Sequence, residues 1–308
     1  IANTFAKDLL LSNTGKLYAV ASRNLEKAKQ FSNKHNAALY YDTYEALVND
    51  PNVDVVYIAT PHALHFENTM LCFNQNKAVL CEKPMGINTR QVETMINEAK
   101  SKNLFFMEGL WTRFIPTTEK LLELIKQDAI GDIISIQADF GFKADIDLEG
   151  RLYNKKLGGG ALLDIGIYPI FTALSTLGKP NSINANATFF KNGADAECTM
   201  SFNYNDAKAT LKSTLLENTP TQAIFTFETA VVKMNTKFHE PSTVTIIKNN
   251  IEETIDFNYK TIGYNYETEH FNQLLRGGKK ESTIMTFDFS KILIKTLDEV
   301  RALIGLEY

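Results

Sequence analysis

The stretch VDVVYIATPHALHFENTMLCFNQNKAVLCEKP (53–84) decides the fold class. It opens with VDVVYIA (53–59), a continuous apolar run that is typical of a strand buried on both faces of a parallel sheet. A helix is expected at about 62–75, and AVLCE (78–82) forms the next apolar run. A strand, a helix and a second strand in this order predict a parallel sheet with a crossover helix.

The same alternation extends to both sides of this stretch. Further strands and helices are expected at KLYAVASR (16–23), ALYY (38–41), LFFMEG (104–109), and at 1–11, 24–36, 44–50 and 89–103. This pattern predicts a dinucleotide-binding Rossmann domain at 1–110, with a doubly wound parallel sheet. Because no strand precedes the first helix, we expect the first strand and its glycine loop about 15 residues upstream of Ile1.

The pattern of apolar and polar residues changes beyond residue 110. DIISIQADFGF (132–142) and most of 182–257 alternate apolar and polar residues with period two, with short polar turns between the runs. This alternation is typical of an antiparallel sheet. Helices are expected before and after these runs, so residues 111–308 predict an α+β domain with a large, mostly antiparallel open sheet, which would bind substrate and form oligomers.

Composition and charge exclude several classes of protein. The 308 residues are 44% hydrophobic and 22% charged, with a net charge of -4, so no basic surplus favours a nucleic-acid partner. No apolar run reaches the roughly 18 residues that span a bilayer, which predicts no membrane partner. The cysteines are few and widely spaced, which favours structural thiols in a reducing, cytoplasmic compartment; they are Cys72, Cys81 and Cys198.

Ser22 and Arg23 stand at the end of the strand expected at 16–23. In a dinucleotide-binding fold this position faces the adenine ribose, where an acidic residue binds the 2′-hydroxyl of NAD and an Arg accommodates the 2′-phosphate of NADP. The alternative is an ordinary surface arginine. The position predicts that Ser22 and Arg23 bind NADP, with NAD also possible.

TPHALH (60–65) follows the most apolar strand, at the carboxyl edge where such sheets bind ligands. The two histidines form an H-x-x-H, but no Cys or carboxylate stands at ligand spacing, so we expect no metal. We expect cofactor contacts from Thr60, Pro61, His62 and His65.

CEKPMG (81–86) places Glu82 and Lys83 at the carboxyl end of a second buried strand. A buried lysine shifts its pKa readily, as a general acid or base requires. The alternative is a lysine that extends from the strand end into solvent. We expect Lys83 to be catalytic, and Glu82, Trp111 and Arg113 to lie at the cofactor.

GGGALLDIGIYP (158–169) carries Asp164 and Tyr168 four residues apart on an expected helix, and so on one face of it. A carboxylate and a phenol on one helix face indicate a polar pocket. The alternative is a core tyrosine whose hydroxyl the aspartate satisfies. We expect both residues to be catalytic.

Four motifs together resemble the Gfo/Idh/MocA oxidoreductase family. They are VDVVYIATPHALH, the EKP at 82–84, MEGLWTRF (107–114) and GGGALLDIGIYP (158–169), and they keep the family's order over essentially the whole chain. The VASR run, the WTRF run and the tyrosine of the last motif are most similar to the branch of dimeric dihydrodiol dehydrogenases and NADP-linked D-xylose dehydrogenases.

The resemblance implies roles for individual residues. Lys83 matches the lysine that touches the substrate hydroxyl, Asp164 and Tyr168 match the catalytic pair, and His62 and Trp111 match positions that line the cleft. The implied activity is that of an NADP-dependent dehydrogenase, which moves a hydride between the nicotinamide and a hydroxyl-bearing carbon of a sugar, polyol or cyclic diol. The implied assembly is a homodimer or higher homo-oligomer. Runs such as AIFTFET (223–229) and STVTIIK (242–248), with apolar residues at alternate positions, predict that it forms through the exposed face of the second domain's sheet.

Two other functions remain open from the sequence. The first is a non-catalytic, NADP-binding regulator of the same fold, against which the intact Lys83, Asp164 and Tyr168 argue. The second is a reductase of a carbon–carbon double bond, which has no evident need for these three polar residues.

Overall fold

The computed structural model describes residues 1–12, 14–143 and 145–308. The chain divides into two compact units, each made of segments that are distant in sequence. The first unit contains Ile1–Gly86, Arg90–Arg113 and Lys260–Ser290, and the second contains Ile87–Thr89, Phe114–Tyr259 and Lys291–Tyr308. The predicted boundary at residue 110 therefore has a counterpart at 113, but the segment 260–290 groups with the first unit.

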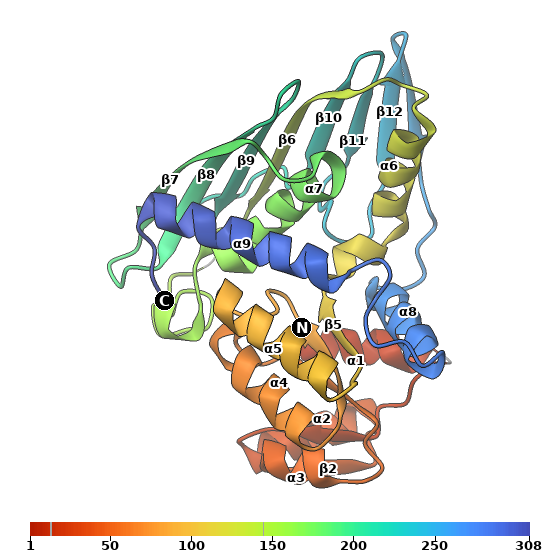
Figure 1. Cartoon of the computed structure of the whole chain (residues 1–308), viewed down its shortest axis with the longest axis vertical. Coiled ribbons are helices and arrows are strands. Elements are labelled where there is room, and N and C mark those ends of the chain that lie inside the picture. The colour runs from red at the N-terminus through yellow and green to blue at the C-terminus, as the bar shows by residue number, and fades with distance from the viewer. Residues whose placement is uncertain (13, 144) are drawn as a thin grey trace. The chain divides into compact units, whose positions relative to one another are not determined.

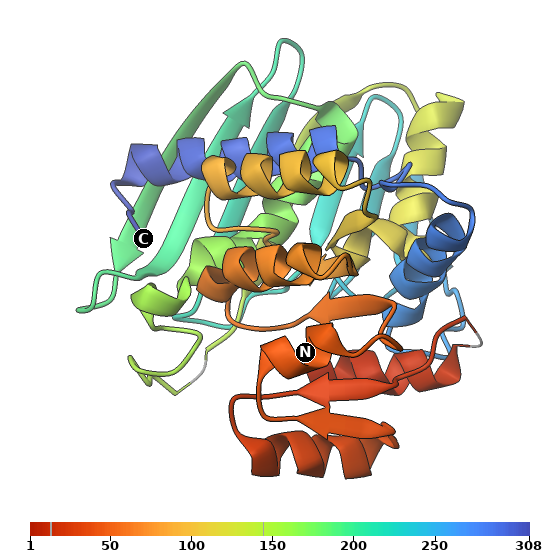
Figure 2. The ribbon, with the colours of Figure 1, turned by 60° about the horizontal axis from the view of Figure 1, so that its bottom comes forward.

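The strands of the first unit form two parallel sheets (Figure 2). One sheet pairs β1 with β2, and the other has the order β3-β4-β5. The strands are β1 (Ala19–Ala21), β2 (Leu39–Tyr41), β3 (Val55–Ile58), β4 (Ala78–Glu82) and β5 (Phe106–Gly109). All five residues of β4 are buried, as the continuous apolar run predicted.

Helices alternate with these strands along the chain. They are α1 (Ala2–Leu11), α2 (Leu25–His35), α3 (Tyr44–Asn49), α4 (His65–Asn74), α5 (Thr89–Ser101) and, from the later segment, α8 (Tyr264–Arg276). The Asn24 side chain caps α2 by accepting from the Lys27 N–H at 3.0 Å. The predicted order of strand and helix is confirmed.

Helix α8 joins the first unit because its beginning is bonded to α1. The Asp8 carboxylate accepts hydrogen bonds from the backbone N–H groups of Ile262 at 3.1 Å and Tyr264 at 2.8 Å. Phe271 of α8 packs edge-to-face against Phe105, with ring centroids 4.6 Å apart. No local sequence pattern connects Asp8 with residues more than 250 positions later, so the sequence placed this helix in the wrong unit.

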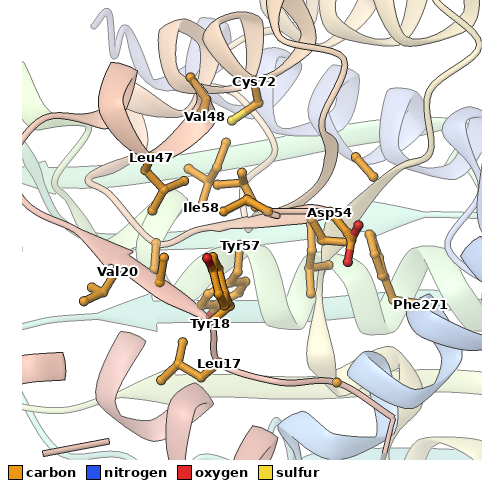
Figure 3. A pocket seen from close by; sticks show the side chains of 18 of the residues that line it. Leu17, Tyr18, Val20, Leu47, Val48, Asp54, Tyr57, Ile58, Cys72 and Phe271 are labelled. Carbon is orange, nitrogen blue, oxygen red and sulfur yellow. The ribbon is translucent and has the colours of Figure 1, made fainter. Parts of the chain in front are cut away.

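A cavity of about 1210 Å³ lies between the two parallel sheets of this unit (Figure 3). Residues of β1 and β3 line it, together with parts of α1, α3 and α8. The edges of β1 and β3 that face it pair with no other strand among the described residues. The cavity therefore lies where a doubly wound sheet has its central strand, between β1 and β3. The expected first strand stays a prediction.

The second unit is built on an eight-stranded sheet with the order β13-β12-β11-β10-β6-β9-β8-β7 (Figure 1). Neighbouring strands are antiparallel except β6 and β9, which run parallel. The strands are β6 (Ile133–Gly141), β7 (Ser182–Phe189), β8 (Asp195–Asn203), β9 (Lys208–Thr214), β10 (Ala223–Phe227), β11 (Val231–Met234), β12 (Val244–Lys248) and β13 (Ile251–Ile255). The predicted large, mostly antiparallel sheet is confirmed.

Helix α7 (Ile167–Leu177) packs against β6 and β9 and covers part of one face of this sheet (Figure 1). It continues from a π-helical turn, Leu162–Gly166, although the sequence predicted one helix that carries both Asp164 and Tyr168. The other helices that contribute to this unit are α6 (Pro116–Gln127) and α9 (Phe287–Ile304), the latter from Lys291 onward. Within the described chain one segment, Lys155–Leu177, passes a length and composition test for a membrane span, but 94% of its most apolar window is buried in the protein. It is therefore a core helix here.

Candidate active site

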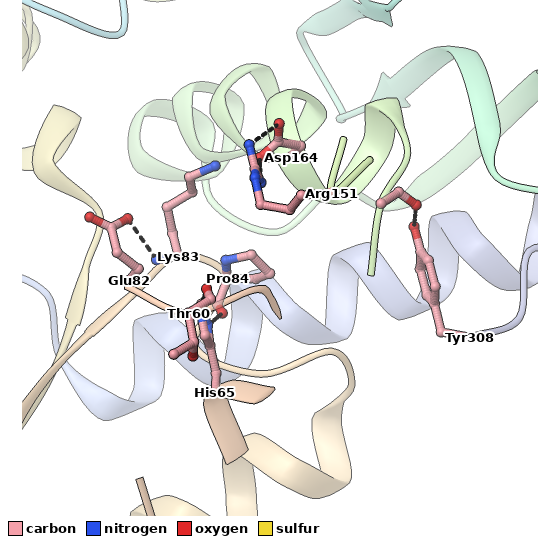
Figure 4. A network of polar contacts seen from close by, with 9 residues as sticks. Thr60, His65, Glu82, Lys83, Pro84, Arg151, Asp164 and Tyr308 are labelled. Atoms are coloured by element: carbon pink, nitrogen blue, oxygen red, sulfur yellow. Dashed lines mark hydrogen bonds and ion pairs between the residues drawn. The ribbon is translucent and has the colours of Figure 1, made fainter. Parts of the chain in front are cut away.

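Lys83 directly follows β4, at the carboxyl end of the strand, and only 3% of its surface is exposed (Figure 4). The side chain of Glu82 accepts a hydrogen bond from the Lys83 backbone N–H at 3.3 Å. It also accepts a hydrogen bond from the Tyr57 hydroxyl. Burial raises the pKa of Glu82, whereas Tyr57 and the nearby Lys83 act in the opposite direction. The buried position of Lys83 excludes the alternative of a lysine that extends into solvent.

His65 was predicted to contact the cofactor, but its ring nitrogens lie beside backbone carbonyl groups. Its ring nitrogens lie 2.7 Å from the carbonyl oxygen of Pro84 and 2.9 Å from that of Thr60. The residue is completely buried, and this burial lowers the pKa of the imidazole to about 3. Because both nitrogens face backbone carbonyls, His65 has no polar atom left for a cofactor, and the prediction of a direct contact is corrected.

Three of the predicted cofactor residues border the cavity between the parallel sheets: Ser22, Thr60 and Pro61. Ser22 follows β1 and Thr60 follows β3, so both mark carboxyl ends of strands. Figure 3 shows mostly apolar and aromatic side chains around this cavity, with Leu17, Val20 and Tyr57 among them, together with the carboxylate of Asp54. The structure thus brings together residues that the sequence placed at one ligand-binding edge.

Arg23, next to Ser22, is exposed, and Arg113 is half-buried at the end of the turn Trp111–Phe114. The Trp111 ring is 5% exposed and stacks on Tyr264 with centroids 4.4 Å apart and an interplanar angle of 16°. His62 is 4% exposed, with its ring centroid 5.7 Å from that of His65. The stacking of Trp111 on α8 was not predicted.

Two buried acids near Lys83 were missed by the sequence analysis. Glu108 of β5 accepts a hydrogen bond from the Met85 backbone N–H at 2.8 Å, and burial raises its pKa to about 7. Glu267 of α8 is completely buried, and neither of its carboxyl oxygens has a hydrogen-bond partner among the described residues. Burial and the neighbouring Glu82 raise the pKa of Glu267 well above its usual value.

In the second unit, Asp164 lies in the π-helical turn and forms an ion pair with Arg151 (Figure 4). The guanidinium nitrogens lie 3.2 and 3.5 Å from the two carboxylate oxygens. The Asp164 side chain is 8% exposed and that of Arg151 is 45% exposed, so the charge of a buried acid is balanced from a polar loop. Arg151 was also missed, because nothing in a loop sequence shows which acid an arginine will meet.

Tyr168, one turn later in α7, is 6% exposed and surrounded by rings. Its ring centroid lies 5.0 Å from that of His239 and 5.6 Å from that of Phe140. His239 and Phe140 stack with centroids 4.1 Å apart. His239 comes from a loop some 70 positions from Tyr168 in sequence, and no motif in the sequence connected them.

Asp195 fixes the backbone that leads into the π-helical turn. It accepts a hydrogen bond from the Leu162 N–H at 2.6 Å, and it is fully buried. Burial raises its pKa to about 6. A Cβ on Gly160, whose φ is +131°, would lie 2.0 Å from the Asp195 Oδ1. The glycines of this motif thus permit a close approach of backbone and carboxylate, which is the role that glycine plays in such turns.

No three His, Cys, Asp or Glu side chains gather closely enough to hold a metal ion in the described part of the chain. The cysteines Cys72, Cys81 and Cys198 are buried and free. Burial raises the pKa of Cys72 and Cys198 to about 12, so neither thiol is poised as a nucleophile.

Sequence models of one protein family match both units. The model described as an oxidoreductase family with an NAD-binding Rossmann fold matches residues 1–110, and that of the GFO/IDH/MocA C-terminal domain matches residues 118–232. The chain belongs to the GFO/IDH/MocA family. The predicted family, its Rossmann fold and its class of oxidoreductase that binds a nicotinamide dinucleotide are confirmed.

Characterised relatives within the GFO/IDH/MocA family extend over nearly the whole chain. The trans-1,2-dihydrobenzene-1,2-diol dehydrogenase of Xenopus tropicalis is 36% identical over 301 residues, which cover 94% of this chain and 90% of that protein. The enzyme of the same name from Mus musculus is 34% identical over 323 residues and covers 100% of this chain and 95% of that protein.

Solved structures share the GFO/IDH/MocA fold over both units. The 3-ketoreductase KijD10 from Actinomadura kijaniata, in complex with NADP and TDP-benzene, has a TM-score of 0.88 at 24% identity and covers 97% of this chain and 93% of its own. The aldose-aldose oxidoreductase from Caulobacter crescentus, complexed with glycerol, also has a TM-score of 0.88, at 21% identity, and covers 97% of this chain and 92% of its own.

Proposed function

We propose that this protein is an NADP-dependent dehydrogenase that moves a hydride between the nicotinamide and a hydroxyl-bearing carbon of a cyclic diol, sugar or polyol. The observation that carries the proposal is the buried Lys83 at the carboxyl end of β4. Ligands of parallel α/β sheets bind beyond this edge of the sheet. The names of the characterised relatives, dihydrodiol dehydrogenases, support a diol as the substrate.

The residues at the sheet edge fit a nicotinamide dinucleotide with a 2′-phosphate. Arg23 is exposed and adjacent to Ser22, so a guanidinium and a hydroxyl are both within reach of an anionic group beyond β1. We propose that Ser22 and Arg23 hold the phosphate and that Thr60, Pro61, His62, Glu82, Trp111 and Arg113 belong to the rest of the binding site. When bound, NADP supplies the hydride acceptor or donor.

The protein's own part of the reaction is proton handling. Oxidation of a hydroxyl-bearing carbon releases the hydroxyl proton, which a positioned side chain must accept. We assign this work to Lys83 and Tyr168, the pairing that the family resemblance implies. Asp164, held by Arg151 at 3.2 Å, is assigned as the third member, a fixed negative charge in the turn before Tyr168.

Turnover of a substrate panel tests this function. Cyclic trans-diols, aldoses and polyols are mixed with excess NADP⁺, and NADPH formation is followed by absorbance, with Tyr168→Phe as a paired variant. We expect turnover of at least one class and its loss in the variant. Tight NADPH binding without turnover of any member would instead favour the non-catalytic regulator.

We also propose a cytoplasmic homodimer or higher homo-oligomer formed through the eight-stranded sheet. One face of β10 to β12 carries Ile224, Thr226, Val231, Lys233 and Ile247, which are partly accessible and occupy neighbouring register positions. This face is more polar than the runs AIFTFET and STVTIIK suggested, but its branched apolar residues suit a partly polar interface. Light scattering should give at least twice the 34.6 kDa chain mass at micromolar concentration. A monomer mass would contradict the assembly.

A further inference from the structure

The segment that carries Lys83 is held by its immediate neighbours. The Lys83 backbone N–H donates to a carboxylate oxygen of Glu82 at 3.3 Å. The carbonyl oxygen of Met85 accepts from the Cys81 thiol at 3.6 Å. Both bonds are buried and span four residues or fewer, so they shape the segment but do not attach it to the rest of the unit.

Strand pairing attaches the segment at Cys81 and Glu82, and two residues from other elements attach it beyond Lys83. A ring nitrogen of His65, at the start of α4, lies 2.7 Å from the carbonyl oxygen of Pro84. The carboxyl group of Glu108, in β5, accepts from the Met85 N–H at 2.8 Å. The two backbone groups immediately after Lys83 are therefore bonded to two different neighbours of β4.

We propose that His65 and Glu108 are positioning residues for Lys83. They fix the backbone at Pro84 and Met85 and thereby the direction in which the lysine side chain leaves the strand end. The proposal rests on the proposed function, in which Lys83 handles the substrate proton.

His65 is suited to this role because its ring is completely buried beside the end of β4, and its second nitrogen also lies near a carbonyl oxygen. That oxygen, 2.9 Å away, belongs to Thr60 at the end of β3. Asn68 of α4 donates to the Thr60 hydroxyl at 3.1 Å, which fixes the same residue a second time. With a pKa of about 3 the imidazole is neutral and carries a single N–H, so it donates to only one of the two carbonyl oxygens. The shorter contact, 2.7 Å, assigns that N–H to Nδ1 and the hydrogen bond to Pro84, immediately after Lys83.

Glu108 is suited to the role because it keeps an accepting oxygen whether its carboxyl group is protonated or ionised. In the register of β4 and β5, Glu108 lies opposite Cys81, four residues before Met85. Its pKa of about 7 means that it is partly protonated near neutrality. The carboxylate accepts from the Met85 N–H, and so does the carbonyl oxygen of the protonated acid. A glutamine keeps that acceptor, whereas a leucine of similar size does not.

A long, flexible side chain such as that of lysine depends strongly on a fixed backbone for its position. The lysine side chain is long and has many rotamers, and a misplacement of about 1 Å in a reacting group costs on the order of 100-fold in rate. Pairing with β3 and β5 fixes β4 as far as Cys81 and Glu82. The bonds of His65 and Glu108 extend that fixation to Pro84 and Met85, beyond the end of the strand.

The experiment compares His65→Phe, His65→Asn, Glu108→Leu and Glu108→Gln in the full chain. We expect His65→Phe and Glu108→Leu to lower kcat by about 10- to 100-fold while the Kd for NADPH changes less than about threefold. Glu108→Gln should retain kcat within about threefold, and His65→Asn should fall between His65→Phe and the wild type. Amide hydrogen exchange should accelerate at 83–86 in His65→Phe and Glu108→Leu only.

His35→Phe is the matched control. His35 is another buried histidine of this unit, with a ring nitrogen 2.8 Å from the Asn3 Oδ1. Its loss should lower stability without lowering kcat. If His65→Phe does not fold, the proposal is tested by His65→Asn and by the comparison of Glu108→Leu with Glu108→Gln. Wild-type kcat in Glu108→Leu, or equal losses in Glu108→Gln and Glu108→Leu, would overturn the proposal.

Failure of the proposed function gives a different result. A wild-type protein that turns over no member of the substrate panel would refute the dehydrogenase. The exchange data then test the positioning alone: faster exchange of the Met85 amide in Glu108→Leu but not in Glu108→Gln supports it, and unchanged exchange in both overturns it.

Discussion

Buried acids have different partners in the two polar clusters of this protein, the one around Lys83 and the one before Tyr168. Around Lys83, Glu82 and Glu108 accept hydrogen bonds from backbone N–H groups, and Glu267 has no partner within the described residues. Before Tyr168, Asp164 is paired with the guanidinium of Arg151. Burial raises the pKa of the carboxyl groups in the first cluster although Lys83 opposes this rise at Glu82 and Glu108, whereas an arginine at ion-pair distance stabilises the charge of Asp164.

This difference separates two tasks that acids perform beside a reaction. A carboxyl group that keeps its accepting oxygen in either protonation state holds backbone in place, as Glu108 does at Met85. A carboxylate paired with a half-exposed arginine keeps a fixed charge, as Asp164 does. We expect substitutions in the first cluster to act through geometry and those in the second to act through charge.

The largest effect is expected from Lys83→Ala. It should cut kcat by at least about 100-fold, the usual scale for a lost proton-transfer group, while NADPH binding stays largely intact. Steady-state kinetics and fluorescence titration with NADPH measure the two quantities. A variant with near-normal kcat would remove Lys83 from the mechanism, and the acids around it would then have no positioning role in catalysis.

Arg151→Ala should lower kcat/KM by about 30-fold, because loss of a charged hydrogen bond at a buried acid costs on the order of 2 kcal/mol. Arg151→Lys keeps the charge but not the two-nitrogen contact, so it should retain more activity. If Arg151→Lys and Arg151→Ala were equally impaired, the geometry of the guanidinium, not its charge, would be what Asp164 requires.

The preference for NADP over NAD should be about tenfold or more in kcat/KM, the scale of one charge-assisted hydrogen bond. The double substitution Ser22→Asp with Arg23→Ala should erase or reverse it, since the aspartate repels the 2′-phosphate. Kinetics with both cofactors give the ratio. Equal use of NAD and NADP by the wild type would defeat this prediction, and a preference unchanged by the double substitution would assign the phosphate to other residues.

The smallest effect is expected on stability, at Asp195. Its folded pKa of about 6 lies above its ordinary value, so the folded state binds the proton more tightly than the unfolded state does. The resulting stability is fully present below about pH 4 and is lost as the pH rises through 6, by about 1 kcal/mol between pH 5 and 7. Asp195→Asn should flatten this part of the curve of unfolding free energy against pH. The half-buried Glu197→Gln in the same strand should not, and an unchanged slope in Asp195→Asn would contradict the assignment.

The sequence by itself determined which elements form and where strands end. Continuous apolar runs such as AVLCE become strands buried on both faces, and polar residues placed just after them, such as Lys83, must lie at the carboxyl edge of the sheet. Period-two alternation likewise predicted the sheet of the second unit. These conclusions depend only on spacing along the chain.

Only the tertiary structure decided which distant side chains meet. Local patterns place residues on a face or at an edge, but Arg151 meets Asp164 and Glu267 approaches Glu82 only after loops and helices have packed. The same holds for His65, which was predicted to bind cofactor and instead lies with its ring nitrogens beside the carbonyl oxygens of Thr60 and Pro84. Burial and hydrogen-bond partners set the charge and role of a polar group, and both are properties of the packed chain.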